Sequence, residues 1–363
     1  MTAKPKGLAK IWREIKRPFL QSFQIISYKK LKQASCIAWL DASTLCQLDC
    51  PPCYMRQSKY GAVGAGYLKF TDFKNFLNKN SYIKCIEISN NGEICLNPEL
   101  PQILKYASEN NVAITANTGN NFNTVSDETL EALVKYRVLS IRIALDGATP
   151  ETYSQYRRKG DFNKVISNIK KLNEYKKEYD SEFPKLTWQF VLMQHNQDEV
   201  QQAKKLAAEL GMDVWYKLAW DQNFKANNPQ WLRDVTGLEF FTRDEYNQHG
   251  RSYTREAIHC CKSLWISPCI NFDGKLMGCD CNVKYDLGAN VFKDGMEKAL
   301  KNKVFKFMQK VAQGKVKKPP KDWEKWCPCA TCSHYLQIRD YKVYVTDEMV
   351  KQIKEEFWVD VIH

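Results

Sequence analysis

The chain has 363 residues, a length typical of about two domains. It is 44% hydrophobic and 26% charged, which excludes a disordered or collagen-like chain. No apolar run reaches the roughly 18 residues that span a bilayer, and no secretory signal is visible. The 14 cysteines lie in clusters in a long chain, a pattern that indicates metal sites rather than a disulfide scaffold. We therefore expect a cytoplasmic, reducing location.

The formal charge of +13 is concentrated in two segments. Residues 1–33 carry nine Lys or Arg against one acid, and residues 293–325 carry eleven Lys against four acids. Such segments bind acidic partners or membrane surfaces, or simply form a solvated face that aids solubility. Because no nucleic-acid-binding module accompanies them, we expect no sequence-specific nucleic acid and at most a peripheral membrane contact through the arm at 1–35.

From residue 36 onward, short β-type runs alternate with amphipathic helical patterns. The predicted strands are 36–42, 83–89, 112–117, 138–145, 186–193 and 214–218, and the predicted helices are 71–77, 98–110, 127–135, 162–179 and 197–210. Thr149-Pro150-Glu151 is typical of a helix start, and Gly211 of a left-handed helix end. Six βα units predict a parallel sheet, either a partial barrel or an open doubly wound sheet.

Polar residues follow the predicted strands, where ligands bind in either kind of sheet. The segments are 41–46 after the first strand, 90–93 after the second, 117–119 after the third, 146–147 after the fourth and 194–196 after the fifth. We therefore expect the functional site at the carboxyl ends of the strands.

Cys46, Cys50 and Cys53 lie in the loop after the first strand. Soft thiolates select zinc, Cu(I) or iron–sulfur clusters, and structural zinc needs four closed ligands. Three thiolates on a cubic iron–sulfur cluster leave one iron open to a small molecule, as chemistry requires.

This CxxxCxxC loop in a βα array resembles the radical S-adenosylmethionine (SAM) superfamily over residues 36–220. The resemblance implies a partial (β/α)6 barrel and a [4Fe–4S] cluster on these cysteines. It also implies reductive cleavage of SAM to a 5′-deoxyadenosyl radical, and an electron donor such as flavodoxin or ferredoxin.

Further residues are assigned by the same resemblance. Gly92 and Glu93 match the motif that receives the SAM amino group, although Asn91 and Ile94 depart from its usual Gly-Gly-Glu-Pro. Asn117 corresponds to a ribose contact and Asp146 to a Ser-Ile-Asp-Gly motif in which Ala144 replaces the serine. Arg157, rather than Arg158, corresponds to the partner of the SAM carboxylate. Tyr54 either covers the adenine or packs on the barrel rim.

The C-terminal cysteines resemble the SPASM/Twitch extensions, which hold auxiliary [4Fe–4S] clusters. The shorter, one-cluster Twitch form fits Cys261, Cys279, Cys329 and Cys332, because Ile338 interrupts the run of the two-cluster form. Cys260, Cys269, Cys281 and Cys327 stay unassigned; Cys260 is an alternative to Cys261, and Cys327 to Cys329. A zinc ribbon is a further alternative for this segment.

The expected organisation is therefore a basic arm (1–35), a radical SAM partial barrel (36–225), a linker (226–258), an α+β SPASM/Twitch domain (259–336) and a helical tail (337–363). The expected function is hydrogen abstraction from a small polar, sugar- or aminocyclitol-like substrate, with the auxiliary cluster assisting oxidation or epimerisation. Alternatives are a maturase that modifies or cross-links peptides and a non-catalytic zinc protein.

Overall fold

The computed structural model describes residues 37–51, 53–57, 61–218, 224–241, 245, 261–340 and 342–351. The basic arm at 1–35, Cys260 and the end of the tail lie outside these residues, as do most of the residues between 242 and 260. Among the described residues, no helix combines the length and apolar character needed to cross a membrane.

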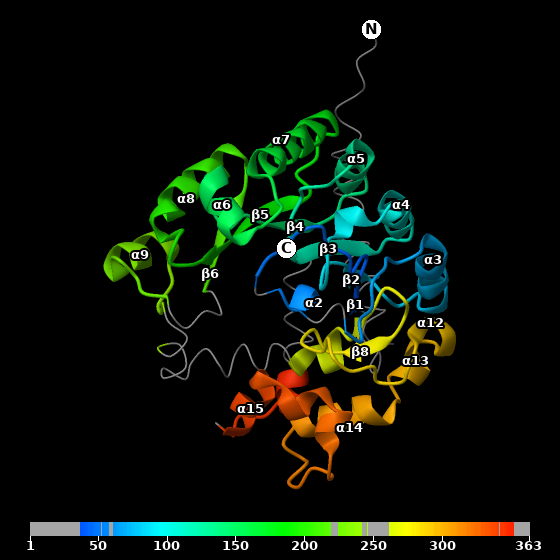
Figure 1. Ribbon diagram of the computed structural model, residues 1–363. Helices are drawn as coiled ribbons and strands as arrows, with labels where there is room; N and C mark the ends of the chain where they lie inside the picture. Colours follow the sequence, from blue (N-terminus) through cyan, green and yellow to red (C-terminus); the bar gives the residue numbers. More distant parts are fainter. Residues whose placement is uncertain are drawn as a thin grey trace.

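Six βα units build one parallel sheet, as the alternation of patterns predicts (Figure 1). Its strands are β1 (Ile37–Leu40), β2 (Cys85–Glu87), β3 (Ala113–Asn120), β4 (Ser140–Ala144), β5 (Lys185–Leu192) and β6 (Asp213–Leu218). The helices are α2 (Tyr54–Gln57), α3 (Phe70–Lys79), α4 (Leu100–Glu109), α5 (Asp127–Lys135), α6 (Pro150–Tyr156), α7 (Phe162–Glu178), α8 (Val200–Glu209) and α9 (Pro229–Thr236), with 3₁₀ turns η1 (Ile94–Leu96) and η2 (Gln197–Glu199). The partial barrel is thereby confirmed.

Local signals determine where these helices begin and end. The Thr149 side chain caps α6 by accepting from the Thr152 N–H, and Pro150 occupies the first turn, as predicted. Gly211 adopts φ +66° directly after α8, the left-handed conformation expected there.

A C-terminal hairpin extends the sheet beyond the barrel. β7 (Cys269–Ile270) pairs parallel with β1, and β8 (Leu276–Gly278) pairs antiparallel with β7, giving the order β6-β5-β4-β3-β2-β1-β7-β8. The turn signal at 271–274 predicts the hairpin but not its pairing with β1, which would otherwise be an open edge strand. The remaining C-terminal elements are α12 (Val291–Asp294), α13 (Met296–Ala299), α14 (Lys303–Ala312), η3 (Trp323–Lys325), η4 (Pro328–Thr331) and α15 (Ser333–Asp340). Of the predicted helical tail (337–363), residues 337–340 belong to α15 and residues 347–351 are also helical.

The two faces of the sheet differ in character because side chains alternate along each strand. The outer face carries apolar side chains such as Ile86, Ile141 and Trp188, all fully buried in the main core. Helices α3, α4, α5, α7 and α8 cover this face in an arc (Figure 1). The opposite, inner face carries polar side chains in register, among them Glu87 beside Thr115. A barrel whose inner face is polar is suited to hold a hydrophilic ligand.

Candidate active site

The loop that carries Cys46, Cys50 and Cys53 is held from several sides. The Thr44 N–H donates to the Gly66 carbonyl at 2.9 Å, and the Asp49 N–H donates to the Arg158 carbonyl at 2.9 Å. The Asn97 amide donates to the Ala42 carbonyl at 2.9 Å. These bonds bring the loop to the carboxyl-end rim, as the sequence predicts.

The three thiols lie within electrostatic reach of one another. Burial, followed by the charges of Glu93, Cys50 and Cys53, raises the pKa of Cys46 to about 12. Burial also raises the pKa of Cys50, while Arg157 opposes the shift. A soft cation that binds these thiols must displace their protons. The donor set therefore fits an iron–sulfur cluster, with three thiols on one short loop.

Asp146 and Arg157 form a buried ion pair beside Cys50. Arg157 Nε donates to Asp146 Oδ2 at 2.6 Å, and Asp146 Oδ1 accepts from the Val191 N–H at 2.8 Å. Arg157 Nη1 lies 3.7 Å from the Cys50 sulfur. The two residues assigned from separate motifs thus meet at the cysteine loop. Arg158, the rejected alternative, is exposed.

Gly92 and Glu93 pack directly against the same loop. The Glu93 N–H donates to the Leu45 carbonyl at 2.8 Å, and a Cβ on Gly92 would lie 2.5–2.7 Å from backbone atoms of residues 43–45. The Glu93 carboxylate is fully buried and accepts from the N–H groups of Cys95 at 3.2 Å and Asn121 at 2.5 Å. Glu93 therefore ties the loop after β2 to the residues after β3.

Asn117 lies within β3 rather than at its end, because β3 extends to Asn120. Its N–H donates to the Glu87 carboxylate at 3.0 Å, and its side-chain amide donates to Ser140 Oγ at 2.8 Å. Asn121 directly follows Asn120, the last residue of β3. The stretch predicted as 112–117 stops early because Gly119 and Asn120 have weak strand propensity, which pairing with β4 overrides.

Asn121 is a site residue that the sequence reasoning missed. Its side-chain amide approaches the Cys46 sulfur at 3.6 Å, and its Oδ1 accepts from the Gln47 amide at 2.9 Å. Asp41 lies in the flagged segment 41–46 but was given no role: both its oxygens accept from Asn91, at 3.0 Å from the backbone N–H and 2.9 Å from the side chain. The sequence signal that could have identified Asn121 was the polar run 120–123 at the end of β3.

Tyr54 begins α2 beside the C-terminal elements, with the Lys284 ammonium 5.8 Å from its ring centre. Cys53 packs in a small apolar cluster with Cys269 of β7, whose other members are Met55, Val63, Met277, Trp39 and Val283. The hairpin that extends the sheet therefore lies against the cysteine loop.

The four thiols assigned to an auxiliary cluster lie near one another although 68 positions of the sequence separate Cys261 from Cys329. Burial raises the pKa of Cys279 well above its usual value, with smaller contributions from Asp280, Cys332 and Cys261. The pKa of Cys329 is raised first by its hydrogen bond with Cys327, then by burial and by the charges of Cys327, Cys279 and Cys261. This soft-donor set also fits an iron–sulfur cluster.

Of the unassigned cysteines, Cys327 hydrogen-bonds Cys329, which lowers the pKa of Cys327. The Cys281 sulfur lies 3.7 Å from His334 Nδ1.

No three Cys, His, Asp or Glu side chains in the described part of the chain gather closely enough to hold a single metal ion. Tetrahedral zinc, at about 2.3 Å from each sulfur, requires such a gathering. The zinc ribbon stays a prediction for this segment, because Cys260 lies outside the described residues.

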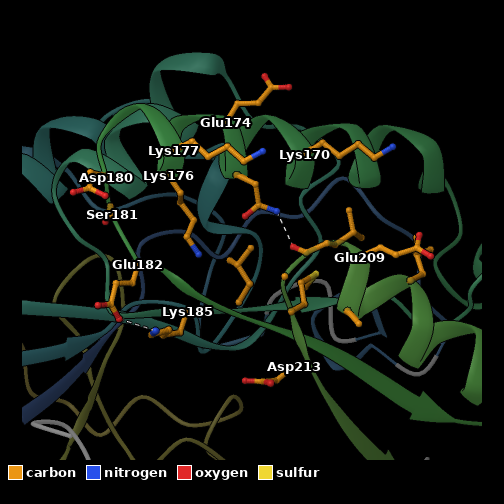
Figure 2. Close-up of a pocket in the computed structure, with 17 residues that line it drawn as sticks. Lys170, Glu174, Lys176, Lys177, Asp180, Ser181, Glu182, Lys185, Glu209 and Asp213 are labelled. Carbon is orange, nitrogen blue, oxygen red and sulfur yellow. Dashed lines mark hydrogen bonds and ion pairs between the residues drawn. The ribbon is translucent and has the colours of Figure 1, made fainter.

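One pocket lies away from the cysteine loop, at the amino-terminal ends of β5 and β6 (Figure 2). Lys185 and Asp213, the first residues of these strands, line it together with Lys170, Glu174 and Lys177 of α7. Its charges are mixed, and Lys185 pairs with Glu182 at 3.0 Å. This pocket occupies the end of the sheet opposite to the candidate active site.

Comparisons with known proteins agree with this geometry. Residues 42–207 match the family model described as the radical SAM superfamily. The fold is similar to that of SuiB of Streptococcus suis bound to S-adenosylmethionine, with a TM-score of 0.56 and 13% identity over 93% of this chain and 77% of that one. It is also similar to SuiB bound to the precursor peptide SuiA (TM-score 0.56, 12% identity, 87% and 74% covered).

A further solved structure, native anSMEcpe with bound AdoMet, has a TM-score of 0.52 and 13% identity over 82% of this chain and 86% of that one. No curated relative matches the chain in sequence. At these identities the solved structures establish the fold, while the matched residues 42–207 include the cysteine loop and the motifs around Glu93 and Arg157. Residues 42–207 therefore form a radical SAM domain, and the chain is an enzyme whose cofactors are a [4Fe–4S] cluster and S-adenosylmethionine.

Proposed function

We propose that this enzyme abstracts hydrogen from a small polar substrate held on the inner face of the barrel, and that Cys261, Cys279, Cys329 and Cys332 hold an auxiliary [4Fe–4S] cluster that assists oxidation or epimerisation. The observation that carries the proposal is the meeting of three thiols, Glu93 and the Asp146–Arg157 pair at one rim, above an inner face lined with polar groups.

In this proposal Cys46, Cys50 and Cys53 hold the catalytic cluster. When bound, the cluster and SAM supply a 5′-deoxyadenosyl radical once an electron arrives from a donor such as flavodoxin or ferredoxin. Asn121 and Arg157 stand beside the sulfurs of Cys46 and Cys50 and adjust their charge through hydrogen bonds.

Arg157 is proposed to bind the SAM carboxylate. Asp146 accepts a hydrogen bond from Arg157 Nε. This contact fixes the plane of the guanidinium and leaves its terminal nitrogens available to bind a second anion. Glu93 and the adjacent Gly92 are proposed to receive the SAM amino group, because they sit against the cysteine loop. Asn117 and Tyr54 keep their proposed roles at the ribose and the adenine.

The polar inner face supports a small hydrophilic substrate. Asn117, Ser140 and Gln189 present amide and hydroxyl groups there, and such groups orient a ligand through several hydrogen bonds. A peptide is the second candidate, because the similar SuiB structure contains a bound precursor peptide.

The first experiment measures iron and sulfide after anaerobic reconstitution, then 5′-deoxyadenosine formed from SAM and dithionite. We expect about eight irons per chain for two clusters. Cys50→Ala should abolish SAM cleavage, whereas Cys85→Ala, a matched change at a buried cysteine of β2, should keep it. About four irons in the wild type would contradict the auxiliary cluster.

The substrate class is tested separately, by adding aminocyclitols, sugars and short peptides and following 5′-deoxyadenosine above the substrate-free rate. Stimulation by a peptide alone would favour the second candidate.

A further inference from the structure

Arg142 occupies the middle of the inner face. It lies on β4 in register with Thr187 of β5, two residues before Ala144 ends the strand. Ala144 is in register with Gln189, which is in turn in register with Trp215 of β6. Arg142 therefore stands just below the rim where Asp146 and the cysteine loop meet.

The side chains of Arg142 and Lys217 both lie over the ring of Trp215. The Arg142 guanidinium lies 3.8 Å from the centre of the Trp215 ring, and the Lys217 ammonium lies 5.5 Å from the same centre. Trp215 remains 38% exposed although it lies on a strand of the sheet. Stacking on an indole holds a guanidinium in one plane and leaves its edge free to donate hydrogen bonds.

Arg142 lacks the partner that a buried cation usually has. Its Nε is buried without a hydrogen-bond partner, and no ion pair to Arg142 exists among the described side chains. Burial lowers the pKa of Arg142, while the charge of Glu87 opposes this shift. An unpaired cation in such a place is costly unless an anion joins it.

Glu87 does not fill this role, because its oxygens are already occupied. Oε1 accepts from the Ser89 N–H at 3.0 Å and from Ser89 Oγ at 2.5 Å, and Oε2 accepts from Thr115 Oγ1 at 2.8 Å. The Asn117 N–H donates to both oxygens at 3.0 Å. Glu87 thus organises β2 and β3 locally, and the Arg142 guanidinium is left for a ligand.

We propose that Arg142, Trp215 and Lys217 form a subsite for an anionic group of the substrate, a carboxylate or a phosphate. The planar guanidinium matches two oxygens of such a group, and Lys217 adds a second positive charge. The proposal rests on the proposed function, since it places the anion on the inner face so that the rest of the substrate extends toward the cysteine loop.

The test titrates the anaerobically reconstituted enzyme with inorganic phosphate and, separately, with succinate at constant ionic strength, following tryptophan fluorescence. We expect a saturable change with at least one anion. Trp215→Phe should remove the change, and Arg142→Gln should weaken binding roughly tenfold or more, as loss of a charge-assisted contact does. Arg137→Gln is the matched control, because Arg137 also lies over a ring, 5.1 Å from Phe183, but is exposed.

Arg142→Lys keeps the charge without the planar fork, so it should retain part of the response. Tighter binding of phosphate identifies a phosphorylated substrate, and tighter binding of succinate identifies a substrate with a carboxylate. Equal binding by the wild type and Arg142→Gln, no saturable response in the wild type, or a response that survives Trp215→Phe would overturn the proposal.

SAM cleavage without substrate, measured in parallel, separates the two proposals. A wild type that binds the anion but does not cleave SAM would refute the proposed function and leave the subsite. An Arg142→Gln enzyme that loses SAM cleavage yet keeps the anion response would overturn the subsite, because Arg142 would then serve SAM.

Discussion

Replacing Gly92 with Ala should displace the cysteine loop. A Cβ at this position would lie 2.5 Å from the Thr44 carbonyl carbon, 2.6 Å from the Ser43 oxygen and 2.7 Å from the Leu45 oxygen. Since ordinary contacts begin near 3.4 Å, the loop backbone must move by about 0.9 Å. Backbone atoms held by hydrogen bonds cannot rotate away as a flexible side chain does.

Gly211→Ala provides the matched control. Gly211 has φ +66°, almost the same as the +65° of Gly92, but a Cβ there would meet nothing within 4 Å. Both variants therefore share the left-handed backbone cost of about 1–2 kcal/mol. Gly92→Ala adds an overpacking cost of about 1–3 kcal/mol.

The assay compares apparent thermal unfolding midpoints, iron content and the rate of 5′-deoxyadenosine formation under anaerobic conditions. A misplacement of about 1 Å costs on the order of a hundredfold in rate, so Gly92→Ala should lose SAM cleavage to about that extent. Gly211→Ala should stay within about twofold of the wild type. Equal rates and equal midpoints in the two variants would refute the close approach of Gly92 to the loop.

Three further predictions follow from buried charges and thiols. Arg157→Gln leaves Asp146 buried without its partner and should cost about 3–5 kcal/mol of stability, seen as a lower thermal midpoint, whereas exposed Arg158→Gln should change little. Burial raises the pKa of Asp41 from 3.8 to about 7, so the folded state binds the extra proton and stability falls as pH rises from about 4 to 7. The free energy of unfolding falls by about 4 kcal/mol at most, at 1.36 kcal/mol per pKa unit. Asp41→Asn should abolish this pH dependence. Parallel pH profiles of the thermal unfolding midpoint for the wild type and the variant would contradict the prediction. Cys329→Ala should lose about four irons while Cys327→Ala keeps them, and the opposite iron counts would exchange the two assignments.

The strands and helices of the barrel were predictable because their signals are local. Alternation of apolar runs and amphipathic stretches placed all six barrel strands, and residues 127–135 match α5 at both ends. That helix carries its own cap, since the Ser126 side chain accepts from the Thr129 N–H at 3.1 Å. Signals of this kind lie within a few residues of the element they define.

The prediction was wrong or incomplete where distant segments meet. Strand β3 is longer than its propensity indicates because β4 pairs with its last residues. The pairing of β7 with β1 joins residues more than 200 positions apart, with the Asp41 N–H donating to the Ile270 carbonyl at 3.1 Å. Asn121 was missed because its approach to Cys46 depends on where two strands end relative to each other.

The sequence by itself determined the chemistry of the donors: three thiols within eight residues, eight more toward the C-terminus, and acidic and basic residues after successive strands. Residue type and close spacing are enough for that conclusion, because soft thiolates on one short loop have few other uses. Only the tertiary structure decided that Arg157 pairs with Asp146 beside Cys50 and that Arg142 stacks on Trp215 without a carboxylate partner. These contacts depend on strand register. Packing across the whole sheet sets the register, so no short stretch of the sequence predicts these contacts.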